Sequence, residues 1–127
     1  EGIQAGGGTP VVMSLKSSHR SDVVGELLEA GALIVGSPTL NNNMFPTVAD
    51  VLTYLKGLKP ANLIGATFGS YGWSGEATVQ IKEVLESMGV DLVDDVLKAR
   101  YVPDGDALAR CHALGEVVAG RLVRDKE

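Results

Sequence analysis

Two short segments of the chain combine hydroxyl, amide and aromatic side chains with glycine. They are Ser37-Pro-Thr-Leu-Asn-Asn-Asn43 and Ser70-Tyr-Gly-Trp-Ser-Gly-Glu76, and each follows an apolar run. Tyr71 and Trp73 offer faces on which a ring can stack, while the polar groups can bond to the edges of that ring. The inventory suits a flat heterocycle with polar edges. The alternative is two turn-rich loops in which Trp73 only packs at a rim, and the bare pattern leaves both open.

The runs around these segments predict alternating strands and helices. Strands are expected at 10–15, 32–36, 63–69 and 90–102, the last interrupted near Asp94-Asp95. Helices are expected at 21–30, between Pro46 and Pro60, between Ser74 (a candidate cap) and Gly89, and from Pro103 onward. This order predicts an α/β fold with an open parallel sheet and helices on both faces, a three-layer α/β/α arrangement. Ligands bind such sheets at the C-terminal ends of the strands, so both polar segments should meet at one rim.

Apolar periodicity assigns the buried positions. The expected helical stripes are Val24, Leu27 and Leu28; Val48, Val51, Leu52 and Leu55; Ile81, Val84, Leu85 and Met88; and Leu108, Cys111, Gly115, Val118 and Leu122. The run 32–36 is apolar at every residue, as in a parallel strand covered on both faces. From Leu97 the pattern alternates, with Ala99 and Tyr101 on the inner side.

Composition limits the classes of function. A length of 127 residues suits one domain, and a net charge of −5 argues against nucleic-acid binding. No apolar run approaches the ~20 residues of a membrane span, so no membrane association is expected. The lone Cys111 cannot form an internal disulfide or a cysteine metal cluster, and it fits a reducing, cytoplasmic location.

Several catalytic motifs are nearly matched but fail. Gly69, Gly72 and Gly75 are spaced three and three, unlike the dinucleotide fingerprint GxGxxG. Ser74 misses the last glycine of the nucleophile elbow. His19 and His112 lie on different segments without the spacing of metal ligands. We therefore expect no catalytic residue and no metal site in the chain.

Three segments carry a resemblance to a known family. They are GSPTLNNNMFPTVADVLTYLKGLKP (36–60), IGATFGSYGWSGE (64–76) and YVPDGDALARCHALG (101–115). They closely resemble the flavodoxin-like domain of the flavodiiron proteins, also called A-type flavoproteins. The resemblance runs from the start to the end of the chain and implies a flavodoxin-like fold.

The resemblance also implies FMN as cofactor, held by both loops. Carried over, the ring contacts are Ser37, Pro38, Thr39, Asn41, Asn42, Ser70, Tyr71, Gly72, Trp73 and Gly75. The redox chemistry belongs to the flavin, and the acidic chain should lower its reduction potential. Asn43 stands where some relatives carry glycine, and asparagine tolerates a left-handed backbone.

The resemblance predicts an N-terminally truncated domain over 1–127. Residues 1–8 look like the last turn and exit of a first helix, so the first strand and the phosphate loop are expected to be missing. The strand at 10–15 would then pair directly with 32–36, receive a strand from a second chain, or pair with a part of the polypeptide outside this sequence.

The function implied is an oxidoreductase component. Its flavin would accept electrons from rubredoxin or a flavin reductase and pass them to the diiron, metallo-β-lactamase-like domain of an oxygen or nitric oxide reductase. The sequence does not contain that domain, so this chain alone should reduce neither oxygen nor nitric oxide. Assembly of the chain into a homo-oligomer is left as an open alternative. The alternatives are a flavodoxin-like quinone or iron reductase, and a non-catalytic fragment that binds no flavin.

The loop sequences generate a first prediction. Trp73→Ala should weaken flavin binding with little effect on folding, because the indole is expected to stack on the ring rather than to fill the core. Flavin fluorescence titration and thermal unfolding of both proteins measure the two effects. An unchanged flavin affinity would remove Trp73 from the site.

Overall fold

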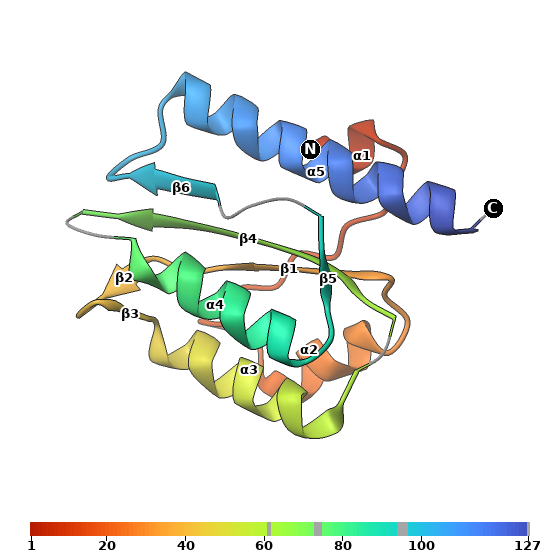
Figure 1. Ribbon diagram of the computed structural model, residues 1–127, viewed down its shortest axis with the longest axis horizontal. Helices are drawn as coiled ribbons and strands as arrows, with labels where there is room; N and C mark the ends of the chain where they lie inside the picture. The colour runs from red at the N-terminus through yellow and green to blue at the C-terminus, as the bar shows by residue number, and fades with distance from the viewer. Residues whose placement is uncertain (61, 73–74, 94–96, 127) are drawn as a thin grey trace.

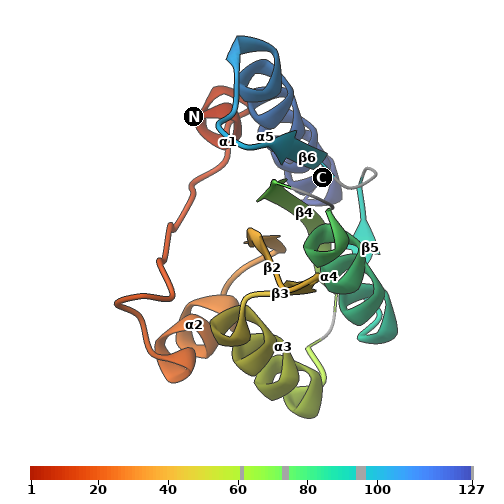
Figure 2. The same cartoon turned by 90° about the vertical axis from the view of Figure 1, so that its left-hand side faces the viewer.

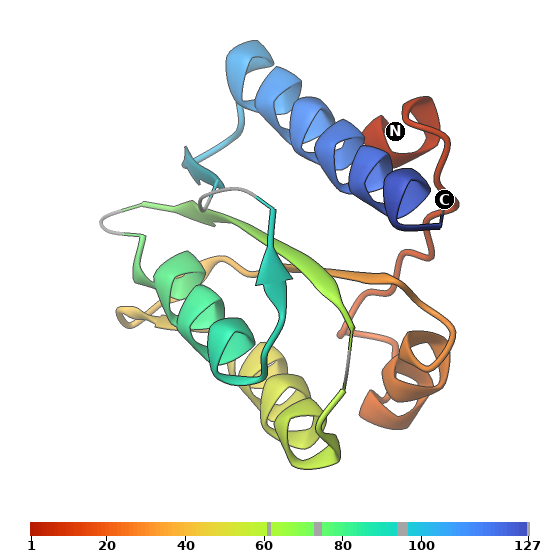
Figure 3. The same cartoon turned by 45° about the vertical axis from the view of Figure 1, so that its right-hand side comes forward.

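The chain folds into three layers around one parallel sheet (Figure 1). The computed structural model describes residues 1–60, 62–72, 75–93 and 97–126. Helices α2 (Arg20–Leu27), α3 (Pro46–Leu58) and α4 (Glu76–Ser87) lie on one side of the sheet. Helices α1 (Gly2–Ala5) and α5 (Gly105–Lys126) lie together on the other side, in red and blue in Figure 3. The predicted fold class is confirmed.

Strand β4 (Ile64–Tyr71) is the centre of the sheet. Along one edge it pairs with β1 (Ala32–Gly36), in a register that sets Gly36 opposite Phe68. It also pairs in turn with β5 (Asp91–Leu92) and β6 (Leu97–Arg100), and every pairing is parallel. The predicted last strand is thus two strands, although residues 94–96, where we expected the interruption, lie outside the described part of the chain. Strands β2 (Thr39–Leu40) and β3 (Asn43–Met44) form a separate antiparallel hairpin.

The core beneath α3 and α4 follows the predicted periodicity. Its buried members are Val48, Leu52, Leu63, Ile81, Leu85 and Val90. All four predicted positions on α3 are buried, and on α4 Val84 and Met88 are half-buried beside the fully buried Ile81 and Leu85. Apolar residues at i, i+3, i+4 and i+7 therefore located this layer correctly.

The stripe predicted for the last helix is partly wrong. Gly115 and Val118 are buried and Cys111 and Leu122 half-buried, but Leu108 is 57% exposed. Ala107, Leu114 and Ala119 are buried instead. The physical reason is that α5 packs against α1 as well as the sheet. A Cβ on Gly115 would come within 2.8 Å of the Ile3 amide nitrogen, so this close helix contact requires glycine.

Near the N-terminus the structure confirms one expectation and corrects another. Helix α1 and its exit match the predicted helical turn within residues 1–8, since Gly6 N–H donates to the Gly2 carbonyl. Helix α2 buries none of its residues, and Leu28, which we placed on its apolar stripe, is 82% exposed. The helix contacts the core through the half-buried Leu27, and an exposed ion pair of 2.9 Å joins its Arg20 to Asp50 of α3.

The strand predicted at 10–15 does not form. The segment pairs with no strand of the described chain, and Val12 is 92% exposed. A strand is stabilised by its ladder of hydrogen bonds, and β1 pairs with β4 along only one of its edges among the described residues. Direct pairing of this segment with residues 32–36 is therefore excluded.

The same open edge explains a second correction. Every residue of β1 is half-buried, although its wholly apolar sequence predicted burial on both faces.

In β6, Leu97 and Ala99 are buried as predicted. Tyr101, which we expected on the same inner side, has a positive φ of 55°, and its side chain is exposed. The candidate cap Ser74 lies outside the described residues, and Gly75 stands at the N-cap of α4.

Thr67 generates a prediction about stability. Its hydroxyl is buried on β4 and has no hydrogen-bond partner in the described chain. Thr67→Val removes this unsatisfied group at nearly constant volume, so we expect a gain of about 1 kcal/mol in the free energy of unfolding. Urea denaturation at neutral pH measures it.

Thr78 provides the matched control. It is equally buried, but its hydroxyl donates to the Gly75 carbonyl over 3.1 Å. Thr78→Val should therefore cost about 1 kcal/mol. Equal effects of the two substitutions would show that the Thr67 hydroxyl is satisfied in solution.

Candidate functional site

The two polar loops leave the sheet at the same edge. Because β1 and β4 are parallel neighbours, both run toward the side on which the β2–β3 hairpin lies (Figure 1). The Ser37 N–H donates to the Phe68 carbonyl over 3.2 Å, which extends the contact beyond the end of β1. The sequence expectation that these loops share one rim is confirmed.

Gly69 makes this close approach of the two backbones possible. A Cβ at Gly69 would collide with the carbonyl oxygen of Ser37 and with the Thr78 side chain. The same holds for Gly36, where a Cβ would overlap the ring of Phe68. Gly69 is therefore the position where the close approach requires glycine, whereas at Gly36 the exposed ring of Phe68 would have to move.

The first loop is a tight hairpin. Thr39 pairs with Met44 and Leu40 with Asn43, which leaves Asn41 and Asn42 as a two-residue turn. Both have positive φ, 50° and 63°, as a type I′ turn requires. The left-handed conformation that we considered for Asn43 is thus adopted by its two predecessors, and Asn43 lies in β3.

Hydrogen bonds within the loop fix its shape. The Ser37 hydroxyl is buried, donates to the Pro38 carbonyl over 2.8 Å and accepts from the Phe45 N–H over 3.0 Å. The Thr39 hydroxyl accepts from the Ala77 N–H of α4 over 3.2 Å. These two hydroxyls therefore have partners in the protein itself, while Asn41 and Asn42 are exposed.

The second loop joins β4 to α4. Ser70, Tyr71, Gly72 and Gly75 are all half-buried, and the Tyr71 carbonyl accepts from the Tyr101 N–H over 2.7 Å. Trp73 and Ser74 lie outside the described residues. Two predicted contacts, Ser70 and Tyr71, are the last residues of β4 and thus belong to the sheet.

Two residues at this rim were missed by the sequence analysis. Gln80 of α4 accepts a hydrogen bond from the Met44 N–H of the hairpin over 2.9 Å. Tyr101 follows β6, and a Cβ on Gly72 would lie 3.2 Å from its ring. Tyr101 could have been predicted at the rim, because it directly follows a strand. Nothing in the sequence around Gln80 indicates a contact with the first loop.

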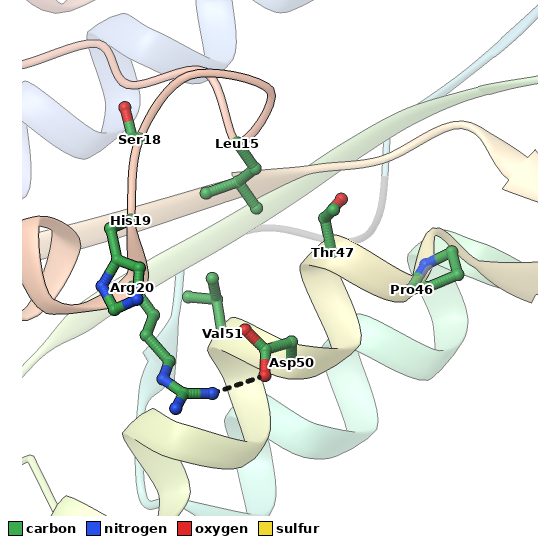
Figure 4. Close-up of a pocket in the computed structure, with 8 residues that line it drawn as sticks. All are labelled: Leu15, Ser18, His19, Arg20, Pro46, Thr47, Asp50 and Val51. Carbon is green, nitrogen blue, oxygen red and sulfur yellow. Dashed lines mark hydrogen bonds and ion pairs between the residues drawn. The ribbon is translucent and has the colours of Figure 1, made fainter.

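A pocket in the described part of the chain lies away from the two polar loops. A cavity of about 290 Å³ opens between the segment before α2 and the start of α3 (Figure 4). It is lined by Leu15, Ser18, His19, Arg20, Pro46, Thr47, Asp50 and Val51. The Arg20–Asp50 ion pair crosses it, and the His19 ring accepts from the Ser21 N–H as the cap of α2. The Arg20, Asp50 and His19 side chains therefore already have partners within the protein.

The described residues hold no group of three or more histidine, cysteine or acidic side chains that could bind a metal ion. In the same part of the chain, no helix is long and apolar enough to cross a membrane. Neither polar loop contains lysine or arginine, although β6 brings Lys98 beside Gly75 and pairs Arg100 with Tyr71.

Comparisons with known proteins agree with this arrangement. A sequence profile described as flavodoxin matches residues 1–114. The nitric oxide reductase of Moorella thermoacetica is 40% identical over 123 residues, which cover 96% of this chain and 31% of that protein. The solved structure of rubredoxin oxygen:oxidoreductase from Desulfovibrio gigas matches with a TM-score of 0.94 and 40% identity, over 98% of this chain and 31% of that one.

A further solved structure, the flavodiiron protein from Giardia intestinalis, matches with a TM-score of 0.90 and 28% identity. The match covers 97% of this chain and 31% of the Giardia protein. This chain thus spans less than a third of the length of each of these three relatives. The chain belongs to the flavodoxin family, as the kind of flavodoxin-like domain that flavodiiron proteins carry.

Proposed function

We propose that this chain is the FMN-binding electron-transfer domain of an oxygen or nitric oxide reductase of the flavodiiron type. The observation that carries the proposal is the shared rim, where the Asn41–Asn42 turn and the end of β4 lie at the C-terminal edge of neighbouring parallel strands. This is the edge at which open α/β sheets bind ligands. Family membership supports a flavin as the ligand, and FMN is the form we propose.

The donor set of the rim fits the ring system of a flavin. Apart from Glu76, which begins α4, the two loops contribute only neutral side chains, and the ring atoms of a flavin present neutral carbonyl and N–H edges. Tyr71 supplies a half-buried aromatic face, and the exposed Asn41 and Asn42 supply the backbone of the left-handed turn. Because neither loop carries a cation, we assign to them the ring and not the phosphate.

The proposed contacts are those that the family resemblance names. They are Ser37, Pro38, Thr39, Asn41, Asn42, Ser70, Tyr71, Gly72, Trp73 and Gly75. The bound flavin supplies the transfer of electrons, and the protein binds and orients it. Ser37 and Thr39 contribute through backbone positions, since their hydroxyls are engaged inside the fold.

The relatives suggest the route of the electrons. One is named rubredoxin-oxygen oxidoreductase and another nitric oxide reductase. We propose rubredoxin or a flavin reductase as the donor and a diiron domain, outside this sequence, as the acceptor. The one-domain assignment over 1–127 and a cytoplasmic location belong to the same proposal.

A flavin titration tests the proposal directly. Purified chain is added to FMN and, in parallel, to riboflavin, and quenching of flavin fluorescence is followed. We expect both to bind, because the two loops contact the ring that both ligands share. If the fluorescence of neither FMN nor riboflavin is quenched, the proposal is contradicted and the alternative of a fragment that binds no flavin is favoured.

The Asn41–Asn42 turn allows a test of the rim's backbone. Asn42→Gly keeps a residue that adopts positive φ, so flavin affinity should stay close to that of the wild type. Asn42→Val places a branched side chain in the left-handed region and should lower the affinity by about tenfold, at a conformational cost of ~1–2 kcal/mol. Fluorescence titration of both variants measures the difference.

Thermal unfolding of the two variants is the control, since both should fold. If glycine and valine reduce the affinity equally, the Asn42 amide carries the contact and the turn geometry does not.

A further inference from the structure

We propose that Gln80, on the second turn of α4, is a positioning residue for the flavin site. It would act by holding the β2–β3 hairpin, and it would not touch the ring itself. The inference rests on the proposed function, because it assigns a role within the same rim. It is carried by a set of hydrogen bonds that join α4 to the hairpin across the fold.

The Gln80 side chain uses both ends of its amide on the hairpin. Its oxygen accepts from the Met44 N–H over 2.9 Å. Its nitrogen donates to Asn43 Oδ1 over 2.8 Å and to the Asn42 carbonyl over 3.3 Å. One side chain thereby fixes β3 and the second residue of the turn.

Asn43 extends this chain of amides to the first residue of the turn. While its Oδ1 accepts from Gln80, its Nδ2 donates to the Asn41 carbonyl over 2.8 Å. Gln80, Asn43 and the turn backbone therefore form one connected network. Such networks hold their members in one geometry, because each bond orients the next group.

The hairpin needs an anchor of this kind. Each of its strands has two residues, and an isolated two-stranded hairpin is marginally stable in water. Its turn also contains two non-glycine residues with positive φ. Thr39 ties β2 to the Ala77 N–H, so Gln80 is the corresponding anchor for β3 and the turn.

Gln80 can be replaced without disturbing the core. The residues of α4 that fill the interior are Ala77, Thr78, Ile81 and Leu85, whereas Gln80 is half-buried at the edge of the helix. Its substitution should therefore change the position of the turn more than the stability of the domain. That difference separates a positioning role from a merely structural one.

The test compares Gln80→Met with a matched control. Methionine keeps the length of the side chain and removes all three hydrogen bonds. Glu83→Met introduces the same side chain at an exposed position of the same helix and also removes one negative charge. Flavin affinity, the reduction potential of bound FMN, the unfolding midpoint and hydrogen exchange of the Met44 amide are measured for each.

We expect Gln80→Met to lower the affinity for FMN and for riboflavin by about tenfold, the equivalent of one or two net hydrogen bonds. The reduction potential should shift and Met44 exchange should accelerate, while Glu83→Met matches the wild type in flavin affinity, unfolding midpoint and Met44 exchange. Gln80→Glu keeps an acceptor for the Met44 N–H but sets a carboxylate oxygen against Asn43 Oδ1 and the Asn42 carbonyl, so its affinity should fall at least as far as that of Gln80→Met.

The outcomes separate this inference from the proposal on which it rests. A wild-type chain that binds no flavin overturns the proposed function and, with it, the assigned role of Gln80. A wild-type chain that binds flavin, together with an unchanged affinity and potential in Gln80→Met, overturns the inference alone. Faster exchange at Met44 without any change in flavin binding would show that the contact is only structural.

Discussion

The close pairing of β1 with β4 is the constraint on which the rest of the rim depends. The register that places Gly36 opposite Phe68 brings the Ser37 carbonyl against Gly69, where any side chain would collide with it. Gly69 therefore allows the two backbones to meet where both strands end. Since both loops begin within a few residues of this contact, a shift of one strand relative to the other would separate them.

Helix α4 transmits this constraint to the loops. The second loop runs directly into its first turn, and the hairpin rests on Ala77 and Gln80. On its other side the same helix buries Ile81 and Leu85 in the core. The hydrophobic packing that positions α4 therefore also positions the two loops that form the rim. The shape of the rim depends on the core as well as on contacts between the loops.

The sequence predicted what local periodicity encodes. The stripes of α3 and α4 and the strand at 32–36 were recovered, because burial of one helix face or one strand leaves its mark on adjacent residues. Contacts between distant residues left no such mark. The Gln80 bond to Met44 spans 36 positions, and the strand pattern at 10–15 could not show that this segment lacks a partner in the described sheet. The Asn41–Asn42 turn was hidden for another reason, since asparagine permits positive φ without requiring it.

The chemistry of the rim follows from backbone geometry more than from charge. Its loops contain no lysine or arginine, and the hydroxyls of Ser37 and Thr39 are bonded within the fold. What the rim offers to a ligand is therefore the left-handed turn, the half-buried ring of Tyr71 and peptide groups beside glycine. Peptide groups cannot be altered by replacing one side chain, but they can be moved by the residues that hold them. The amide network between α4 and the hairpin is such a support, because it holds the peptide groups of the turn from behind.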